Sequence, residues 1–136
     1  MFNPKAEAMP VKDLRKLQGE RLQDLVKRAY NNVPFYKAKL DAKGVKPGDI
    51  RGIGDIAKLP FTMKAEFREQ YPFGMFAVPP REIVRIHASS GTTGKPTVVG
   101  YTRNDIDNWA ECAARSLGCG GATAEDTVQV AYGYGL

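Results

Sequence analysis

A run of small, hydroxylated residues interrupted by a single lysine offers the clearest chemistry in this chain. Positions 89–96 read Ser-Ser-Gly-Thr-Thr-Gly-Lys-Pro. Glycines adopt positive φ without strain, which lets successive backbone N–H groups point into one concavity. The hydroxyls can donate further hydrogen bonds to phosphate oxygens, and the lysine adds a positive charge. The run therefore predicts a loop that holds a polyphosphate. Its predicted phosphate ligands are Ser89, Ser90, Gly91, Thr92, Thr93, Gly94 and Lys95.

The spacing of this run excludes an ordinary P-loop NTPase. In the pattern G-x-x-x-x-G-K-[ST], Ser89 would stand where the first glycine belongs and Pro96 where the hydroxyl belongs. A plain polar surface loop is the simpler alternative. The flanking segments favour a ligand cradle, because residues 83–88 alternate in polarity and residues 97–101 are mostly β-branched or aromatic. We therefore expect the run to form the tip of a hairpin.

The same run resembles the phosphate loop of the acyl-adenylate-forming superfamily, whose pattern is roughly [ST]-S-G-T-T-G-x-P-K. It departs at Thr97, where a lysine is usual, and its own lysine stands at position 95. That departure is similar to the phenylacetate-CoA ligase branch. Further matches to that branch lie at residues 59–62, 71–74, 85–88, 98–102 and 131–136, so the resemblance extends from about residue 25 to the last residue.

This resemblance implies an enzyme that uses ATP, Mg²⁺ and coenzyme A to activate an aryl carboxylate, most simply phenylacetate. Such an enzyme forms an acyl-adenylate and then the coenzyme A thioester, as in phenylacetate catabolism. It also implies that Tyr132 and Tyr134 line the aryl-substrate pocket. From the residues alone, these two tyrosines are equally consistent with ordinary packing aromatics.

Members of the superfamily are much longer than 136 residues, so the chain is expected to be an N-terminal portion that is inactive alone. The superfamily's acidic metal ligand and its C-terminal lysine have no counterpart in the sequence. We therefore assign no catalytic residue and no metal ligand. The alternative, from a different functional class, is a non-catalytic phosphate- or nucleotide-binding module.

Composition excludes several other classes of protein. With 43% hydrophobic residues the chain can form a packed core, and it contains neither an eighteen-residue apolar run nor a secretory signal. These features predict a cytoplasmic protein with no membrane contact. Residues 1–46 hold eleven Lys/Arg against five Asp/Glu, but no nucleic-acid-binding motif accompanies them. A solvated helical surface explains this surplus better than a nucleic-acid partner.

The hydrophobic pattern predicts helices first and a sheet later. A helix is expected over residues 11–31, and Pro34 should begin a second helix that ends near Gly44, giving a helical hairpin. Thr102 and Asp105 form a capping-box pattern for a later helix, which should be followed by a strand at 127–131. The expected inner face of that later helix comprises Ile106, Trp109, Ala110, Ala113 and Leu117.

These elements predict the α/β class, with a helical hairpin followed by part of the large N-terminal domain of an acyl-adenylate-forming enzyme. The expected division is a helical region at 1–80 and the start of an ATP-binding α/β subdomain at 81–136. Strand, helix and strand in this order also predict a parallel strand pair. An incomplete sheet leaves unpaired edges, so a homo-oligomer is expected.

Overall fold

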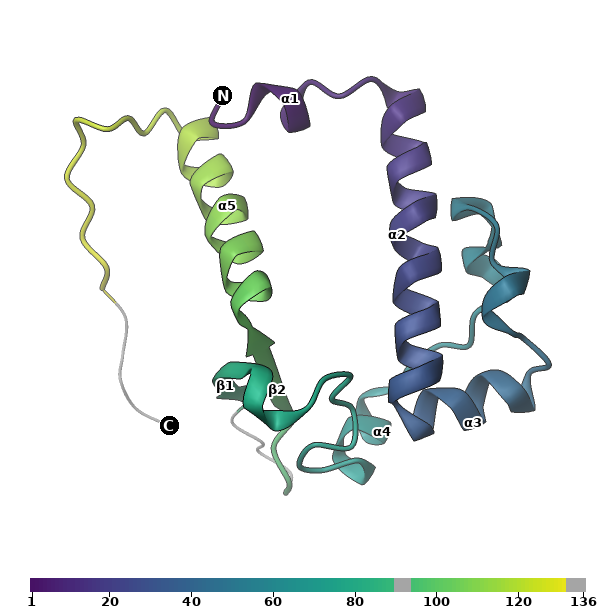
Figure 1. The fold of residues 1–136 in the computed structure, drawn as a ribbon. Helices are drawn as coiled ribbons and strands as arrows, with labels where there is room; N and C mark the ends of the chain where they lie inside the picture. Colours follow the sequence, from purple (N-terminus) through teal and green to yellow (C-terminus); the bar gives the residue numbers. More distant parts are fainter. Residues whose placement is uncertain (90–93, 132–136) are drawn as a thin grey trace.

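The computed structural model describes residues 1–89 and 94–131. Helices dominate, and one pair of strands precedes the last helix (Figure 1). The elements, in order, are α1 (Pro4–Glu7), α2 (Val11–Asn32), α3 (Pro34–Ala42), η1 (Pro47–Asp49), η2 (Ile53–Lys58), α4 (Lys64–Glu69), η3 (Pro80–Glu82), β1 (Ile83–Ala88), β2 (Val98–Thr102) and α5 (Arg103–Cys119). None of the described helices has both the length and the apolar character needed to cross a bilayer.

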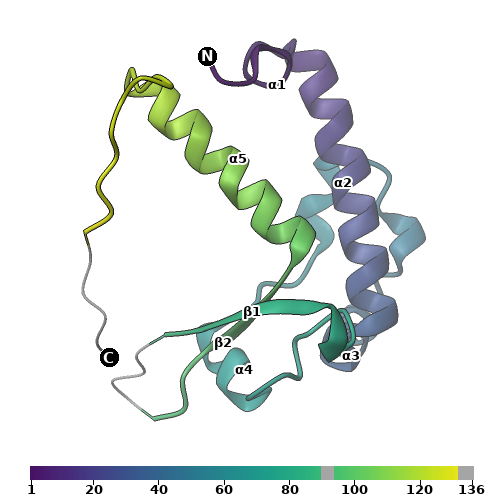
Figure 2. The same cartoon turned by 60° about the vertical axis from the view of Figure 1, so that its left-hand side comes forward.

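The predicted helical pair at the N-terminus is confirmed as α2 and α3. Pro34 occupies the first turn of α3, where its missing N–H costs nothing. Gly44 ends the helix with φ +70°, a conformation in which glycine avoids Cβ strain. In Figures 1 and 2, α3 lies across the end of α2.

A small hydrophobic core lies within this helical region. Its buried side chains come from α2, α3, the residue between these helices and the segment that follows them: Leu22, Val26, Val33, Leu40, Val45 and Ile50. Gly19 lets the short helix η2 approach α2 closely, because a Cβ there would lie 3.2 Å from the Cα of Gly52. The core therefore depends on close backbone packing as well as on apolar area.

One carboxylate ties the helical region together on its outer surface. Asp41 accepts hydrogen bonds from Lys37 at 2.8 Å, from the Tyr30 hydroxyl at 2.7 Å, and from Lys46. The hydrogen bond from Lys37, followed by those from Lys46 and Tyr30, holds the pKa of Asp41 well below its ordinary value of 3.8. Residues of α2, α3 and the turn before η1 thus share one acid.

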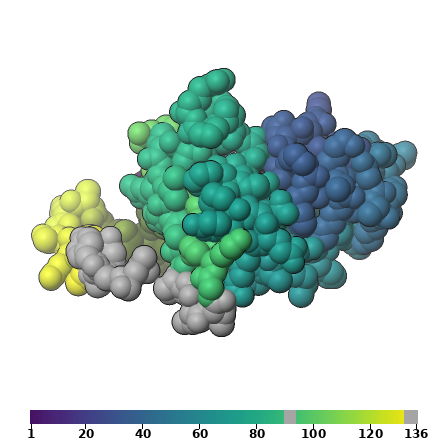
Figure 3. Space-filling model, turned by 90° about the horizontal axis from the view of Figure 1, so that it is seen from below, coloured from purple at the N-terminus to yellow at the C-terminus, as the bar shows by residue number. Residues whose placement is uncertain are grey.

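The two strands form an antiparallel hairpin, as the predicted hairpin tip requires. Ile86 pairs with Gly100 and Ala88 with Val98, and the register shifts between Ile83 and Arg85. The hairpin rests on the segment after α4, where the ring of Phe76 lies against Gly100. Seen from below, the hairpin and this segment occupy the centre of the molecule, and the helical region lies to one side (Figure 3).

The capping box at the start of α5 is confirmed. The Thr102 hydroxyl accepts the N–H of Asp105 at 3.2 Å, and the Asp105 carboxylate accepts the N–H of Thr102 at 2.9 Å. Midway along the helix, the Asn3 side chain donates to the Glu111 carboxylate at 2.7 Å. The N-terminal segment with α1 therefore bridges α2 and α5 (Figure 1).

Two predictions about the C-terminal part are wrong. Residues 127–131 form no strand, so the expected parallel pair is absent from the described residues. Val128 and Val130 are exposed, and no strand among the described residues pairs with their backbone. The expected inner face of α5 is also largely uncovered: Ile106 is half-buried, whereas Trp109, Ala110, Ala113 and Leu117 are exposed.

We expect Gly100→Ala to destabilise the hairpin. A Cβ at this position would lie 2.7 Å and 2.8 Å from two atoms of the Phe76 ring and 3.0 Å from Ile83 Cδ1. Phe76 also packs against Phe73, so the ring cannot move away without losing that contact. Overpacking of this kind costs about 1–3 kcal/mol. The measurement is urea unfolding. Gly48→Ala is the control, since nothing lies within 4 Å of its Cβ position; equal effects of both changes would contradict the packing argument.

We expect Asp41→Asn to lower stability at neutral pH and to reduce the loss of stability in acid. Because the folded pKa of Asp41 is depressed, its contribution is present above the ordinary pKa of 3.8 and disappears as the pH falls below that value. Thermal unfolding of both proteins from pH 7 to pH 2 measures this. Asp24→Asn is the control, an exposed α2 carboxylate without an ion pair to any residue in the described ranges. Parallel pH curves for wild type and Asp41→Asn would refute the assignment.

Candidate functional site

The predicted phosphate loop lies where the hairpin places it, between the end of β1 and the start of β2. Its base is closed by two hydrogen bonds. The Ser89 N–H donates to the Thr97 carbonyl at 3.0 Å, and the Thr97 N–H donates to the Ser89 hydroxyl oxygen at 3.2 Å. The two ends of the chain that flank the predicted loop are thus held together. Ser90, Gly91, Thr92 and Thr93 lie outside the described residues.

The return side of the loop carries its two other described ligand candidates. Gly94 has φ +119°, a conformation that strains any residue with a Cβ. Lys95 follows with an exposed side chain. Its Nζ lies 5.9 Å from the centroid of the Tyr71 ring, within the range of a cation–π contact. The loop lysine therefore has an aromatic neighbour that comes from outside the hairpin.

The sequence did not identify Tyr71 as a neighbour of Lys95. The residue belongs to the motif at 71–74, which contributed only to the overall resemblance. No local pattern connects it with Lys95, because the two positions are 24 residues apart. Their proximity arises from the path of the chain after α4, which returns beneath the hairpin. The one sequence signal that could have pointed to Tyr71 is that it is an aromatic residue within a matched motif.

Aromatic rings support the hairpin on the side that faces α5. His87 makes edge contacts with Tyr101 and Trp109, with ring centroids 5.1 Å and 5.6 Å away. Tyr101 and Trp109 stack at 5.4 Å. The three rings join β1, β2 and α5. The sole histidine thus packs against both other rings near the loop.

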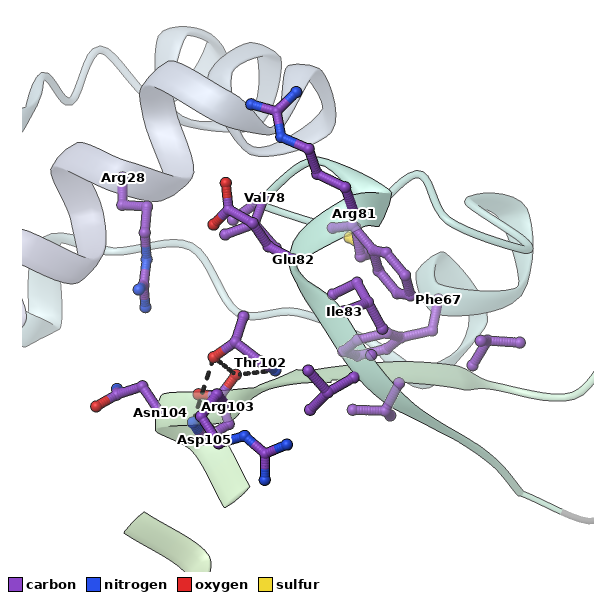
Figure 4. Close-up of a pocket in the computed structure, with 17 residues that line it drawn as sticks. Arg28, Phe67, Val78, Arg81, Glu82, Ile83, Thr102, Arg103, Asn104 and Asp105 are labelled. Atoms are coloured by element: carbon purple, nitrogen blue, oxygen red, sulfur yellow. Dashed lines mark hydrogen bonds between the residues drawn. The ribbon is translucent and has the colours of Figure 1, made fainter. Parts of the chain in front are cut away.

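A hollow of about 660 Å³ opens at the other end of the hairpin (Figure 4). Phe67, Val78 and Ile83 supply apolar wall, and Arg28 and Glu82 stand at its edge. The Thr102–Asp105 capping box borders the same hollow. Ser89, Gly94 and Lys95 do not line it. This hollow is therefore distinct from the candidate phosphate site.

The other predicted site residues receive no test from the geometry. Tyr132 and Tyr134 lie outside the described residues. Within residues 1–89 and 94–131, no cluster of three histidine, cysteine or carboxylate side chains could hold a metal ion. Among the described residues, the candidate site therefore comprises Ser89, Gly94 and Lys95, with Tyr71 beside the lysine.

Comparison with characterised sequences identifies relatives of this chain, although no model of a known protein family matches it. Over 124 residues, the chain is 59% identical to a phenylacetate-coenzyme A ligase from Aromatoleum evansii; this covers 91% of the chain and 28% of the relative. It is 57% identical to the Escherichia coli K12 protein of that name, covering 96% of the chain and 30% of the relative. The Thermus thermophilus protein is 54% identical over the whole chain, which covers 31% of that relative.

Solved structures agree with the sequence relatives. The chain superposes on 2-hydroxyisobutyryl-CoA ligase in complex with 2-HIB-AMP and CoA in the thioesterification state, with a TM-score of 0.75 and 36% identity. The match covers 82% of this chain and 25% of that one. A postadenylation state of the same ligase with R3-HIB-AMP gives a TM-score of 0.77 at 31% identity, covering 88% of this chain and 26% of that one.

These matches support the predicted α/β assignment, because the superposed proteins are CoA ligases seen with acyl-AMP adducts. The chain spans only 28–31% of the length of the sequence relatives. Within that span, the identity of 54–59% extends across the phosphate loop and the helical region together. The sequence resemblance is thus confirmed: this chain is a relative of the phenylacetate-coenzyme A ligases and corresponds to somewhat less than a third of their length.

Proposed function

We propose that this chain supplies the pyrophosphate-holding hairpin of an ATP-dependent ligase. The ligase would convert phenylacetate, or a related aryl acid, through an acyl-adenylate into its coenzyme A thioester. The observation that carries the proposal is the closed turn at Ser89 and Thr97, with Gly94 at positive φ and Lys95 exposed beside it, in a chain related to phenylacetate-CoA ligases.

The chemistry explains why such a loop is needed. A carboxylate oxygen attacks the α-phosphorus of ATP, the bond to the bridging oxygen breaks, and pyrophosphate leaves with the electron pair. The thiol of coenzyme A then attacks the acyl carbon and displaces AMP. Negative charge accumulates on the departing pyrophosphate in the first step. Backbone N–H groups and a lysine aimed at that charge stabilise the transition state more than the bound substrate.

The proposal divides the chain as the sequence predicts. Residues 1–80 would form the helical region, and residues 81–136 would begin the ATP-binding subdomain. The hairpin would hold the β- and γ-phosphates in line with the attack. Tyr132 and Tyr134 would line the aryl-acid pocket. We assign the reaction to the cytoplasm, where ATP and coenzyme A are available.

Mg²⁺ is expected of this reaction, and the described residues do not fit a protein-borne site for it. They contain no cluster of three metal-ligating side chains. When Mg²⁺ accompanies ATP, it neutralises phosphate charge. No step assigned to this chain depends on the ion, and the contribution proposed for the chain is that of its loop.

We expect Lys95→Ala to slow acyl-adenylate formation more than Thr92→Ala does, in a full-length ligase that carries these 136 residues. The lysine would make a charge-assisted contact, which contributes roughly 1.5–3 kcal/mol, whereas a neutral hydroxyl contributes about 0.5–1.5 kcal/mol. The lysine change should reduce adenylation by about tenfold or more. The measurement is pyrophosphate release in a single turnover.

Thioester formation from preformed acyl-adenylate provides the internal control for this experiment. Pyrophosphate has left before that step, so both variants should carry it out at close to the wild-type rate. Lys12→Ala, on the exposed surface of α2, is the matched control for loss of a lysine. Equal losses in both half-reactions would mean that the loop supports the fold or a later conformation, and phosphate binding would be the wrong assignment.

We also propose that the chain forms a homo-oligomer through the unpaired outer edges of its hairpin. Each of the two strands has an outer edge without a described partner strand, and unpaired edges favour association. Val84 and Ile86 on β1 are also exposed. Apolar surface of this kind is usually covered by another surface.

We expect light scattering to detect a species larger than the monomer at high protein concentration. Ile86→Lys should shift it toward the monomer, because it introduces a charge into the exposed apolar surface of β1. Ile56→Lys on η2 is the control, since Ile56 is 55% exposed and Ile86 53%. Either a strictly monomeric wild type or equal dissociation by both variants would refute this interface.

A further inference from the structure

We infer that Tyr71 is a positioning residue for Lys95, holding the loop lysine at the hairpin tip by contact with the face of its ring. The inference rests on the proposed function of the loop and adds to it a residue from outside the loop. The observation is the 5.9 Å separation between Lys95 Nζ and the centroid of the Tyr71 ring. A cation within about 6 Å of an aromatic face is attracted by the quadrupole of the ring.

The backbone around Lys95 is constrained, so the main conformational freedom of this residue lies in its side chain. Two residues further on, Thr97 is fixed to Ser89 by hydrogen bonds at 3.0 Å and 3.2 Å. Pro96 restricts its own φ and disfavours helical conformations of Lys95. The position of the ammonium group therefore depends on the long, flexible stem of the lysine. A lysine stem has considerable rotamer entropy unless something holds its end.

Tyr71 is suited to hold that end because its own position is fixed by the preceding helix. Its N–H donates to the Arg68 carbonyl at 3.3 Å, immediately beyond α4. The side chain is 42% exposed, so one part of it packs and another part remains open to Lys95.

An aromatic partner also keeps the charge of Lys95 available. Among the residues that the structure describes, no carboxylate lies within 4 Å of Lys95 Nζ. A carboxylate in that place would neutralise the lysine and repel a phosphate. A ring face instead orients the ammonium group without competing for an anion. The arrangement thus fits a lysine that must be ready to meet a pyrophosphate group.

The first test examines the contact itself in this 136-residue chain. A ring face shields nearby protons, so the Lys95 ε-methylene resonances should be shifted upfield in the NMR spectrum. Tyr71→Phe keeps the ring and should keep the shift, whereas Tyr71→Leu should abolish it. Resonances unshifted in the wild type, or unaffected by Tyr71→Leu, would overturn the inference whatever the loop binds.

The second test is a double-mutant cycle on acyl-adenylate formation in a full-length ligase that carries this sequence. Tyr71→Leu should slow that step by roughly two- to fivefold, as expected for an exposed cation–π contact. Tyr71→Phe should retain close to the wild-type rate. In a Lys95→Ala background, Tyr71→Leu should have no further effect, because the tyrosine acts through the lysine. Thioester formation from preformed acyl-adenylate should not change.

A matched control separates positioning from general stability. Phe35 lies beneath Lys39 at 5.4 Å in the helical region, so Phe35→Leu removes a similar contact far from the loop. It should leave adenylation unchanged. Equal slowing by Tyr71→Leu with and without Lys95 would overturn the positioning role and leave the loop assignment standing. If Lys95→Ala itself had no effect on adenylation, the proposed function of the loop would fail instead.

Discussion

The contact between the Phe76 ring and the backbone of Gly100 sets the position of the candidate site. A side chain at residue 100 would collide with the ring, so the absence of a Cβ lets β2 lie directly on the segment after α4. The antiparallel pairing with β1 then fixes both ends of the loop, and the Ser89–Thr97 pair closes it. The same segment carries Tyr71, so one packing contact fixes both the lysine and its aromatic neighbour relative to each other.

The features that could be predicted from sequence are those that nearby residues determine. Pro34 begins a helix because of its fixed φ, Gly44 ends it at positive φ, and Thr102 with Asp105 forms a reciprocal cap. The hairpin was predictable for the same reason. A strand at 127–131 was not, since strand formation depends on a neighbour, and Val128 and Val130 have none in the described structure. The prediction that the apolar face of α5 is buried was wrong for the same reason, because burial also depends on a neighbouring element.

The basic surplus of the N-terminal region shows a different limit of sequence reasoning. Its charges suggested a solvated helical surface, and Lys16 at 78% exposure fits that interpretation. Lys37, Lys46 and Lys39 have more specific roles, because the first two share Asp41 and the third pairs with Glu66 of α4. The last pairing spans 27 residues, so helical spacing could not reveal it. The contact between Tyr71 and Lys95 was missed in the same way.

The hydrogen bond between Asn3 and Glu111 has a consequence for the order in which the chain folds. It joins residues 108 positions apart, whereas the contacts within α2 and α3 and within the hairpin are much more local. Closing a long loop costs more entropy than closing a short one, although the cost rises slowly with length. We therefore expect the helical region and the hairpin to form independently and early. The hydrogen bond from Asn3 to α5 should form late, and it then joins the N-terminus of the chain to the second folding unit.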